Sequence, residues 1–136
     1  YIFREWGDIG KTNKELADVI KALGFTKSVI VADSAEQKSI EEIKREGVLR
    51  IKKSAKGKDS VIHGIQKLQN YELIVHSSCN GIITEFENYS WKKDKNSGLY
   101  VNEPVDAFNH YIDALRYSLQ CVGYKVKHFN KSVLGL

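Results

Sequence analysis

The segment Ser28-Val29-Ile30-Val31-Ala32-Asp33 is the part of the sequence that best defines the fold. Its apolar residues follow one another without alternation, which is typical of a strand buried on both faces of a sheet. Helical spacing of apolar residues occurs on both sides of it, over residues 12–23 and 39–46. A buried strand between two helices predicts an α/β fold, in which helices cover both faces of a sheet.

The remaining sequence continues this alternation of strand and helix patterns. Further elements are expected as strands at 1–6, 48–51 and 73–76 and as helices at 59–68, 80–86 and 105–121. Asn96-Ser97-Gly98 is typical of a hairpin turn between strands at 91–94 and 99–101. We therefore expect a mixed sheet flanked by helices, in one domain over residues 1–122 that is followed by a basic tail at 123–136.

The 136 residues carry a formal net charge of +4, with 42% apolar and 28% charged residues. This composition is typical of a folded globular domain and argues against a disordered or fibrous chain. No apolar run approaches the roughly 20 residues that a membrane span needs. The two cysteines, Cys79 and Cys121, lack the spacing of a metal site or a disulfide framework. The basic excess favours a polyanionic partner such as a nucleic acid.

Two parts of the sequence carry side chains that suit a divalent metal ion. Asp33 follows directly after the buried strand, and ligands of open α/β sheets gather at the carboxyl ends of strands. In the last helix, Asp106, His110 and Asp113 recur at helical spacing, with Asn109 beside them. Carboxylate and imidazole groups on one face are what such a site needs. The alternatives are a helix cap at Asp33 and a solvent-exposed polar face on the helix.

Two basic segments are candidates for contact with a phosphate backbone. The first is interrupted by glycine and serine, which allow close approach, and it carries Arg50, Lys52, Lys53, Lys56 and Lys58. The second lies in the expected hairpin, where Lys92 and Lys93 accompany Trp91, an aromatic side chain suited to stacking on a base. Each segment alone could equally be a solubilising loop. Their occurrence together in a basic chain favours a polyanionic partner.

Three segments of this sequence resemble the C-terminal nuclease domain of tailed-phage terminase large subunits. The run Val29-Ile30-Val31-Ala32-Asp33-Ser34-Ala35-Glu36 is similar to a strand of that family and its second catalytic acid. Residues 53–69 are similar to the family's basic loop and following helix. Residues 103–117, the most specific segment, are similar to the closing helix with the third acid. The resemblance extends from about Tyr1 to Leu119.

The resemblance implies a ribonuclease H-like fold and an endonuclease domain that cuts concatemeric double-stranded DNA with Mg²⁺ or Mn²⁺. Asp33 and Asp113 would then be catalytic, metal-binding acids, and His110 a further ligand or catalytic group. Asp106 and Asn109 would support the ligands without binding the metal. The implied partners are an ATPase motor domain of the same protein, a small terminase subunit and a portal. The implied location of the protein is the cytoplasm of a host cell.

The resemblance also places the family's first catalytic acid on a strand upstream of Tyr1. We therefore expect the chain to be partial at its N-terminus, without that strand and its acid. Two alternatives remain open at this point. The chain could be a DNA-binding fragment without catalytic activity, or it could belong to another ribonuclease H-like nuclease of the resolvase or transposase type.

Overall fold

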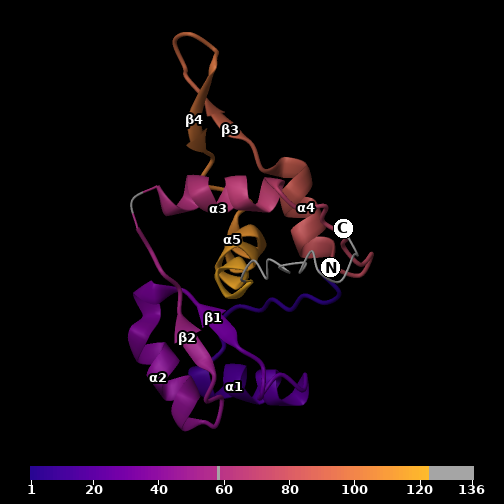
Figure 1. The fold of residues 1–136 in the computed structure, drawn as a ribbon, viewed down its shortest axis with the longest axis vertical. Coiled ribbons are helices and arrows are strands. Elements are labelled where there is room, and N and C mark those ends of the chain that lie inside the picture. The colour runs from indigo at the N-terminus through magenta and orange to yellow at the C-terminus, as the bar shows by residue number, and fades with distance from the viewer. Residues whose placement is uncertain (58, 123–136) are drawn as a thin grey trace, which may run out of the picture.

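The computed structural model describes residues 1–57 and 59–122, and Figure 1 shows their arrangement. The α-helices of this part are α1 (Asn13–Ala22), α2 (Gln37–Arg45), α3 (Ser60–Gln69), α4 (Asn80–Asn88) and α5 (His110–Ser118). Its strands are β1 (Ile30–Ala32), β2 (Ile51–Lys53), β3 (Trp91–Lys93) and β4 (Tyr100–Pro104). Two short 3-10 helices are η1 (Ser34–Glu36) and η2 (Leu119–Cys121). The predicted basic tail at 123–136 lies outside the described residues.

Strands β1 and β2 form a parallel pair in which Ile30 lies opposite Ile51. Helices α1 and α2 lie beside this pair in Figure 1. The side chains buried between these elements are Ala17, Ile40, Ile43, Val48 and Ile51. All three residues of β1 are only half-buried, because β1 pairs with β2 alone within the described residues. The prediction that this strand is buried on both faces was therefore wrong.

Helix α5 bridges the two halves of the described structure. It contacts β1 on one side and both α3 and α4 on the other, and Figure 1 shows it between them. Its buried Ile112, together with Leu119 of η2, packs with Leu68 of α3 in a second core cluster. Because α5 touches both halves, its polar side chains can reach the end of β1.

Strands β3 and β4 form the antiparallel hairpin that the sequence predicts, with Lys93 opposite Tyr100. At the turn, Gly98 has a φ of +67°, which glycine adopts without steric cost. The Asp94 carboxylate accepts a hydrogen bond from the Ser97 N–H at 2.7 Å, which closes the turn. The hairpin projects away from the helices in Figure 1.

The predicted last helix begins at His110 instead of residue 105. Phe108, just before it, has a φ of +53°, outside the right-handed helical region, and is 49% exposed. The Glu85 carboxylate of α4 accepts hydrogen bonds from two backbone N–H groups in the first turn of α5 and so satisfies donors that a helix start leaves unpaired. Asp106 therefore lies in a loop, and the helical face predicted to join Asp106 to Asp113 was wrong.

The mixed α/β fold class is confirmed, although its sheet content differs from the prediction. The described residues form one parallel and one antiparallel pair of strands instead of one continuous sheet. The strands expected at 1–6 and 73–76 are reduced to a single parallel bridge between Ile2 and Val75. The strand expected at 48–51 lies at 51–53. No helix among the described residues is long and apolar enough to cross a membrane.

Candidate functional site

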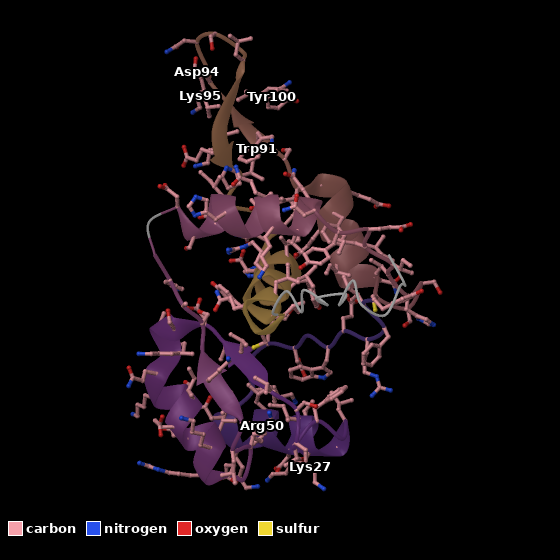
Figure 2. All side chains as sticks on the ribbon, viewed as in Figure 1. Lys27, Arg50, Trp91, Asp94, Lys95 and Tyr100 are labelled. Atoms are coloured by element: carbon pink, nitrogen blue, oxygen red, sulfur yellow. The ribbon has the colours of Figure 1, made fainter. Side chains whose placement is uncertain are left out.

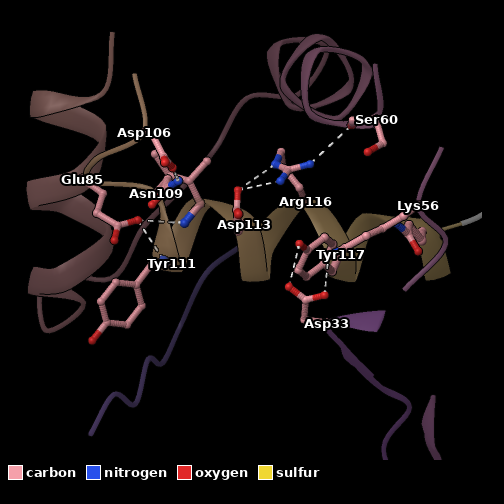
Figure 3. A network of polar contacts seen from close by, with 12 residues as sticks. Asp33, Lys56, Ser60, Glu85, Asp106, Asn109, Tyr111, Asp113, Arg116 and Tyr117 are labelled. Carbon is pink, nitrogen blue, oxygen red and sulfur yellow. Dashed lines mark hydrogen bonds and ion pairs between the residues drawn. The ribbon is translucent and has the colours of Figure 1, made fainter. Parts of the chain in front are cut away.

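Asp33 lies at the carboxyl end of β1 and is the N-cap residue of η1, so it combines the two roles weighed from the sequence. Its Oδ1 accepts a hydrogen bond from the Ala35 N–H at 2.9 Å, and the Lys56 Nζ lies 2.5 Å from the same oxygen. Tyr117 of α5 donates its hydroxyl proton to Asp33 Oδ2 at 3.4 Å (Figure 3). The Ala35 amide, followed by the Lys56 ammonium, holds the pKa of Asp33 below its ordinary value.

Asp113 is held by Arg116, one helical turn further along α5. The Nε and Nη2 groups of Arg116 both donate to Asp113 Oδ1, at 3.1 and 2.6 Å, while Nη1 donates to the Ser60 carbonyl at 3.3 Å (Figure 3). The Arg116 side chain is only 4% exposed, whereas that of Asp113 is 31% exposed. Asp113 Oδ2 accepts no hydrogen bond from the described residues, so the carboxylate is oriented by one oxygen and open at the other.

Asp33 and Asp113 come from distant parts of the sequence, yet both influence the pKa of Tyr117 and the pKa of Lys56. Burial raises the pKa of the Tyr117 hydroxyl, and the negative charges of Asp33 and Asp113 raise it further. The contact with Asp33 raises the pKa of Lys56, to which the charge of Asp113 also contributes. The packing of α5 on β1 therefore places Tyr117, which follows Asp113 by one helical turn, in contact with Asp33 at the end of the strand.

A pocket of about 510 Å³ opens beside Asp113. It is lined by residues from the start of α3 and the loop before it, the hairpin, the loop before α5 and α5 itself, among them Asp59, Lys92, Glu103, Asp106, Asn109 and Asp113. The Asn109 side-chain amide donates to Asp106 Oδ1 at 3.3 Å (Figure 3). The structure thus brings the two predicted supporting residues, Asp106 and Asn109, to the same pocket as Asp113.

His110 does not share this pocket. It lines a different one, together with Trp6, Asp8, Tyr111 and other residues of the N-terminal segment and α5. Among the described residues, no group of three or more His, Cys, Asp or Glu side chains is arranged to hold a metal ion. The structure therefore connects Asp33 to α5 through Tyr117, while Asp113 and His110 line different pockets. The roles of Asp33, Asp113 and His110 as metal ligands stay predictions.

Four polar residues of this region were missed by sequence reasoning: Glu5, Glu85, Arg116 and Tyr117. Glu5 accepts hydrogen bonds from two backbone N–H groups at the start of α4, and Glu85 of α4 does the same for α5. The N-terminal segment thus positions α4, which in turn positions the helix that carries Asp113. Of these four residues, only Arg116 could have been recognised from the sequence. It follows Asp113 by three residues, which is the spacing of an ion pair on one face of a helix.

The first basic segment begins just before β2 and ends before α3. The Arg50 guanidinium donates to the Lys27 carbonyl at 2.7 Å, at the lower edge of Figure 2. Lys52 and Lys53 are exposed on β2, while Lys56 contacts Asp33. Lys58 lies outside the described residues. The segment therefore presents exposed lysines close to the Asp33 locality.

The second basic segment lies on the hairpin. Lys92 forms an ion pair with Glu103, and the Lys93 ammonium lies 4.9 Å from the centre of the Tyr100 ring. Trp91 is half-buried at the base of the hairpin, whereas Tyr100 is 64% exposed further toward the tip (Figure 2). Stacking of Trp91 on a base stays a prediction, and Tyr100 is the more accessible aromatic ring.

Comparisons with known proteins identify relatives of this chain. The terminase large subunit of Bacillus phage SPP1 is 37% identical over 123 residues, and the PBSX phage terminase large subunit of Bacillus subtilis is 31% identical over 121 residues. Each match covers 88% of this chain but only 29% and 27% of those proteins. The chain therefore spans under a third of the length of these relatives.

A solved structure agrees with the sequence comparisons. The crystal structure of the large terminase nuclease domain from bacteriophage SPP1 with bound Mn superimposes with a TM-score of 0.76 at 36% identity, covering 83% of this chain and 65% of that chain. The family described as the terminase RNase H-like domain matches residues 2–121. The match covers both predicted acids and both basic segments, and this chain belongs to the family of terminase RNase H-like domains.

Proposed function

We propose that this chain is the endonuclease domain of a phage terminase large subunit and cuts concatemeric double-stranded DNA with Mg²⁺ or Mn²⁺. The observation that carries the proposal is the packing of α5, the helix that bears Asp113, on β1, where Tyr117 of α5 donates to Asp33 at the end of the strand. The relative with 36% identity has a nuclease domain that was crystallised with bound Mn. This kinship favours the terminase reading over a resolvase or transposase core.

Asp33 and Asp113 have the chemistry to hold a hard divalent cation. Mg²⁺ takes oxygen ligands and is commonly bound by one or two carboxylates together with water and substrate phosphates. Asp113 Oδ2 is open among the described residues, and the Asp33 side chain is 44% exposed, so both carboxylates are accessible. When bound there, such an ion would polarise the scissile phosphodiester and offset the charge that develops during its hydrolysis. We propose His110 as a further group whose participation requires it to turn from its own pocket.

The chain's own residues would orient these acids and the DNA. Arg116 holds Asp113 through a single oxygen, and Tyr117 donates to one oxygen of Asp33, so each carboxylate has a defined direction. Asp106 and Asn109 complete the wall of the adjoining pocket. The exposed lysines of β2 and the hairpin would contact phosphates, which position the duplex without reading its sequence.

The proposal extends to the whole protein because the relatives are terminase large subunits. An ATPase motor domain in the same protein, a small terminase subunit and a portal are the proposed partners, and a host cytoplasm is the proposed location. We propose residues 1–122 as the nuclease domain and 123–136 as a basic tail. 

The test is cleavage of a long linear duplex in Mn²⁺ by the complete protein that carries these residues. Asp33→Asn and Asp113→Asn should each lower the cleavage rate by at least about a hundredfold, because even residues that only support metal ligands contribute about 10–100-fold. Asp18→Asn, which changes an exposed acid on α1, is the matched control and should leave the rate unchanged. Full cleavage by either test variant contradicts the assignment.

A second candidate function is DNA binding without catalysis. It is favoured by one observation, the lack of a cluster of three metal-ligating side chains among the described residues. Salt-dependent binding of a duplex with no cleavage in Mn²⁺ would support it over the nuclease.

A further inference from the structure

The contact between Lys56 and Asp33 places a cation where the proposed function needs a metal ion. The Lys56 ammonium lies 2.5 Å from Asp33 Oδ1 and interacts electrostatically with Tyr117 and Asp113 as well. A divalent cation that binds Asp33 Oδ1 would meet this ammonium at close range, and like charges repel. Lys56 and the metal ion therefore compete for one position beside the carboxylate.

The ion pair is built so that the lysine side chain can leave without disturbing the backbone. Both side chains are 44% exposed, and an exposed ion pair is weak. The backbone before Lys56 is held firmly: Ala55 accepts from and donates to the Gln120 side-chain amide, at 3.0 and 2.8 Å. Ser54 is buried, and its Oγ accepts a hydrogen bond from the Ser34 N–H at 3.2 Å. Release of Lys56 is therefore a change of side-chain rotamer.

The neighbours of Lys56 indicate where the released ammonium goes. Lys52 and Lys53 precede it on the exposed end of β2, and Gly57 follows it in open space. A rotation away from Asp33 adds a further positive charge to this exposed basic segment, where it can reach a phosphate group.

We propose that Lys56 is an internal counter-ion that occupies Asp33 in the metal-free protein and moves to a DNA phosphate when a divalent ion binds. The proposal rests on the proposed function, since it takes Asp33 as a metal ligand. It makes metal binding and DNA binding mutually reinforcing, because each removes Lys56 from a competing contact. Such coupling is reciprocal, so the metal must strengthen DNA binding by the factor by which DNA strengthens metal binding.

The first test measures Mn²⁺ affinity by calorimetry in the complete protein without DNA or nucleotide. Lys56→Gln should bind Mn²⁺ about two- to fivefold more tightly than the parent protein, the range expected from removing an exposed ion pair. Lys53→Gln removes the same charge from the same segment but contacts no acid among the described residues, so its Mn²⁺ affinity should match the parent.

The second test measures the salt dependence of duplex binding, with Ca²⁺ as a cation that permits binding without turnover. In the parent protein, adding Ca²⁺ should steepen the slope of log affinity against log salt by about 0.9, which is the effect of one additional phosphate contact. Lys53→Gln should show the same Ca²⁺-dependent increment, starting from a shallower slope because it lacks the contact of Lys53 itself. The Lys56→Gln variant should lack this increment.

The proposal is overturned if Lys56→Gln and the parent protein bind Mn²⁺ equally, or if Lys53→Gln tightens binding as much as Lys56→Gln. It is also overturned if Lys56→Gln binds no Mn²⁺. None of these results contradicts the proposed nuclease, which is judged separately by the cleavage rates of the Asp33→Asn and Asp113→Asn variants.

Discussion

The two predicted acids differ in what their removal leaves behind. Asp113→Ala would leave the Arg116 guanidinium, whose side chain is 4% exposed, without its carboxylate partner and with the Ser60 carbonyl as its remaining acceptor among the described residues. Breaking a buried ion pair by removing one partner costs about 3–5 kcal/mol, and the partial exposure of Asp113 favours the lower end, about 3 kcal/mol. Asp33→Ala breaks an exposed pair, worth about 0.2–1 kcal/mol, and a helix cap, worth about 1 kcal/mol.

We therefore predict that Asp113→Ala lowers the free energy of unfolding by about 1–2 kcal/mol more than Asp33→Ala. The assay is urea denaturation of the 136-residue chain, followed by circular dichroism, with the slope m used to check that the denatured states are comparable. Adding Arg116→Met to Asp113→Ala should restore most of the loss, because an apolar side chain of similar length needs no partner. Equal losses in the two single variants, or no recovery in the double variant, would refute this account of the Asp113 site.

Three further predictions concern the residues that support the site. A Cβ at Gly64 would lie 2.9 Å from Arg116 Cδ, so Gly64→Ala should displace the Arg116 side chain. We expect the free energy of unfolding in urea to fall by about 1–2 kcal/mol, despite the better helix propensity of alanine, and a stabilised variant would contradict this. Glu85→Ala should speed amide hydrogen exchange in the first turn of α5 at least about tenfold, since it removes the acceptor of two N–H groups, and unchanged exchange would argue against the cap. The Ser97 N–H and hydroxyl hold the pKa of Asp94 below its ordinary value. The ionised carboxylate therefore stabilises the turn at pH values above the ordinary pKa of aspartate, and this contribution is lost as the pH falls through the lowered pKa. NMR titration of the Ser97 amide should show a midpoint below 3.8, and a midpoint above it would contradict the turn geometry.

Elements with local signals were predictable from the sequence. Helix α1 begins after Thr12, whose side chain forms a capping box with Glu15, and such a pair is visible in the sequence. The hairpin follows from Asn96-Ser97-Gly98, because glycine at the turn permits the positive φ that the structure shows. The position of Asp33 at the end of a strand was predictable for a similar reason, since it directly follows an apolar run.

Features that depend on distant contacts were not predictable. The start of α5 is set by Glu85 of α4, so helical spacing alone extended the helix through Phe108 and gave Asp106 a helical face. The contacts of Asp33 with Lys56 and Tyr117 arise because α5 packs on β1, and no periodicity in the sequence encodes that packing. The separation of His110 from the two acids has the same origin.

The proposal on which the nuclease function depends most is that Asp33 and Asp113 together hold one divalent ion. Its most direct test is a crystal structure of the complete protein soaked in Mn²⁺, with anomalous diffraction to locate the metal. We expect an anomalous peak between the two residues, within coordination distance of a carboxylate oxygen of each, with Lys56 turned away from Asp33. A peak bound by neither acid, or no peak in this locality at a saturating Mn²⁺ concentration, would contradict it.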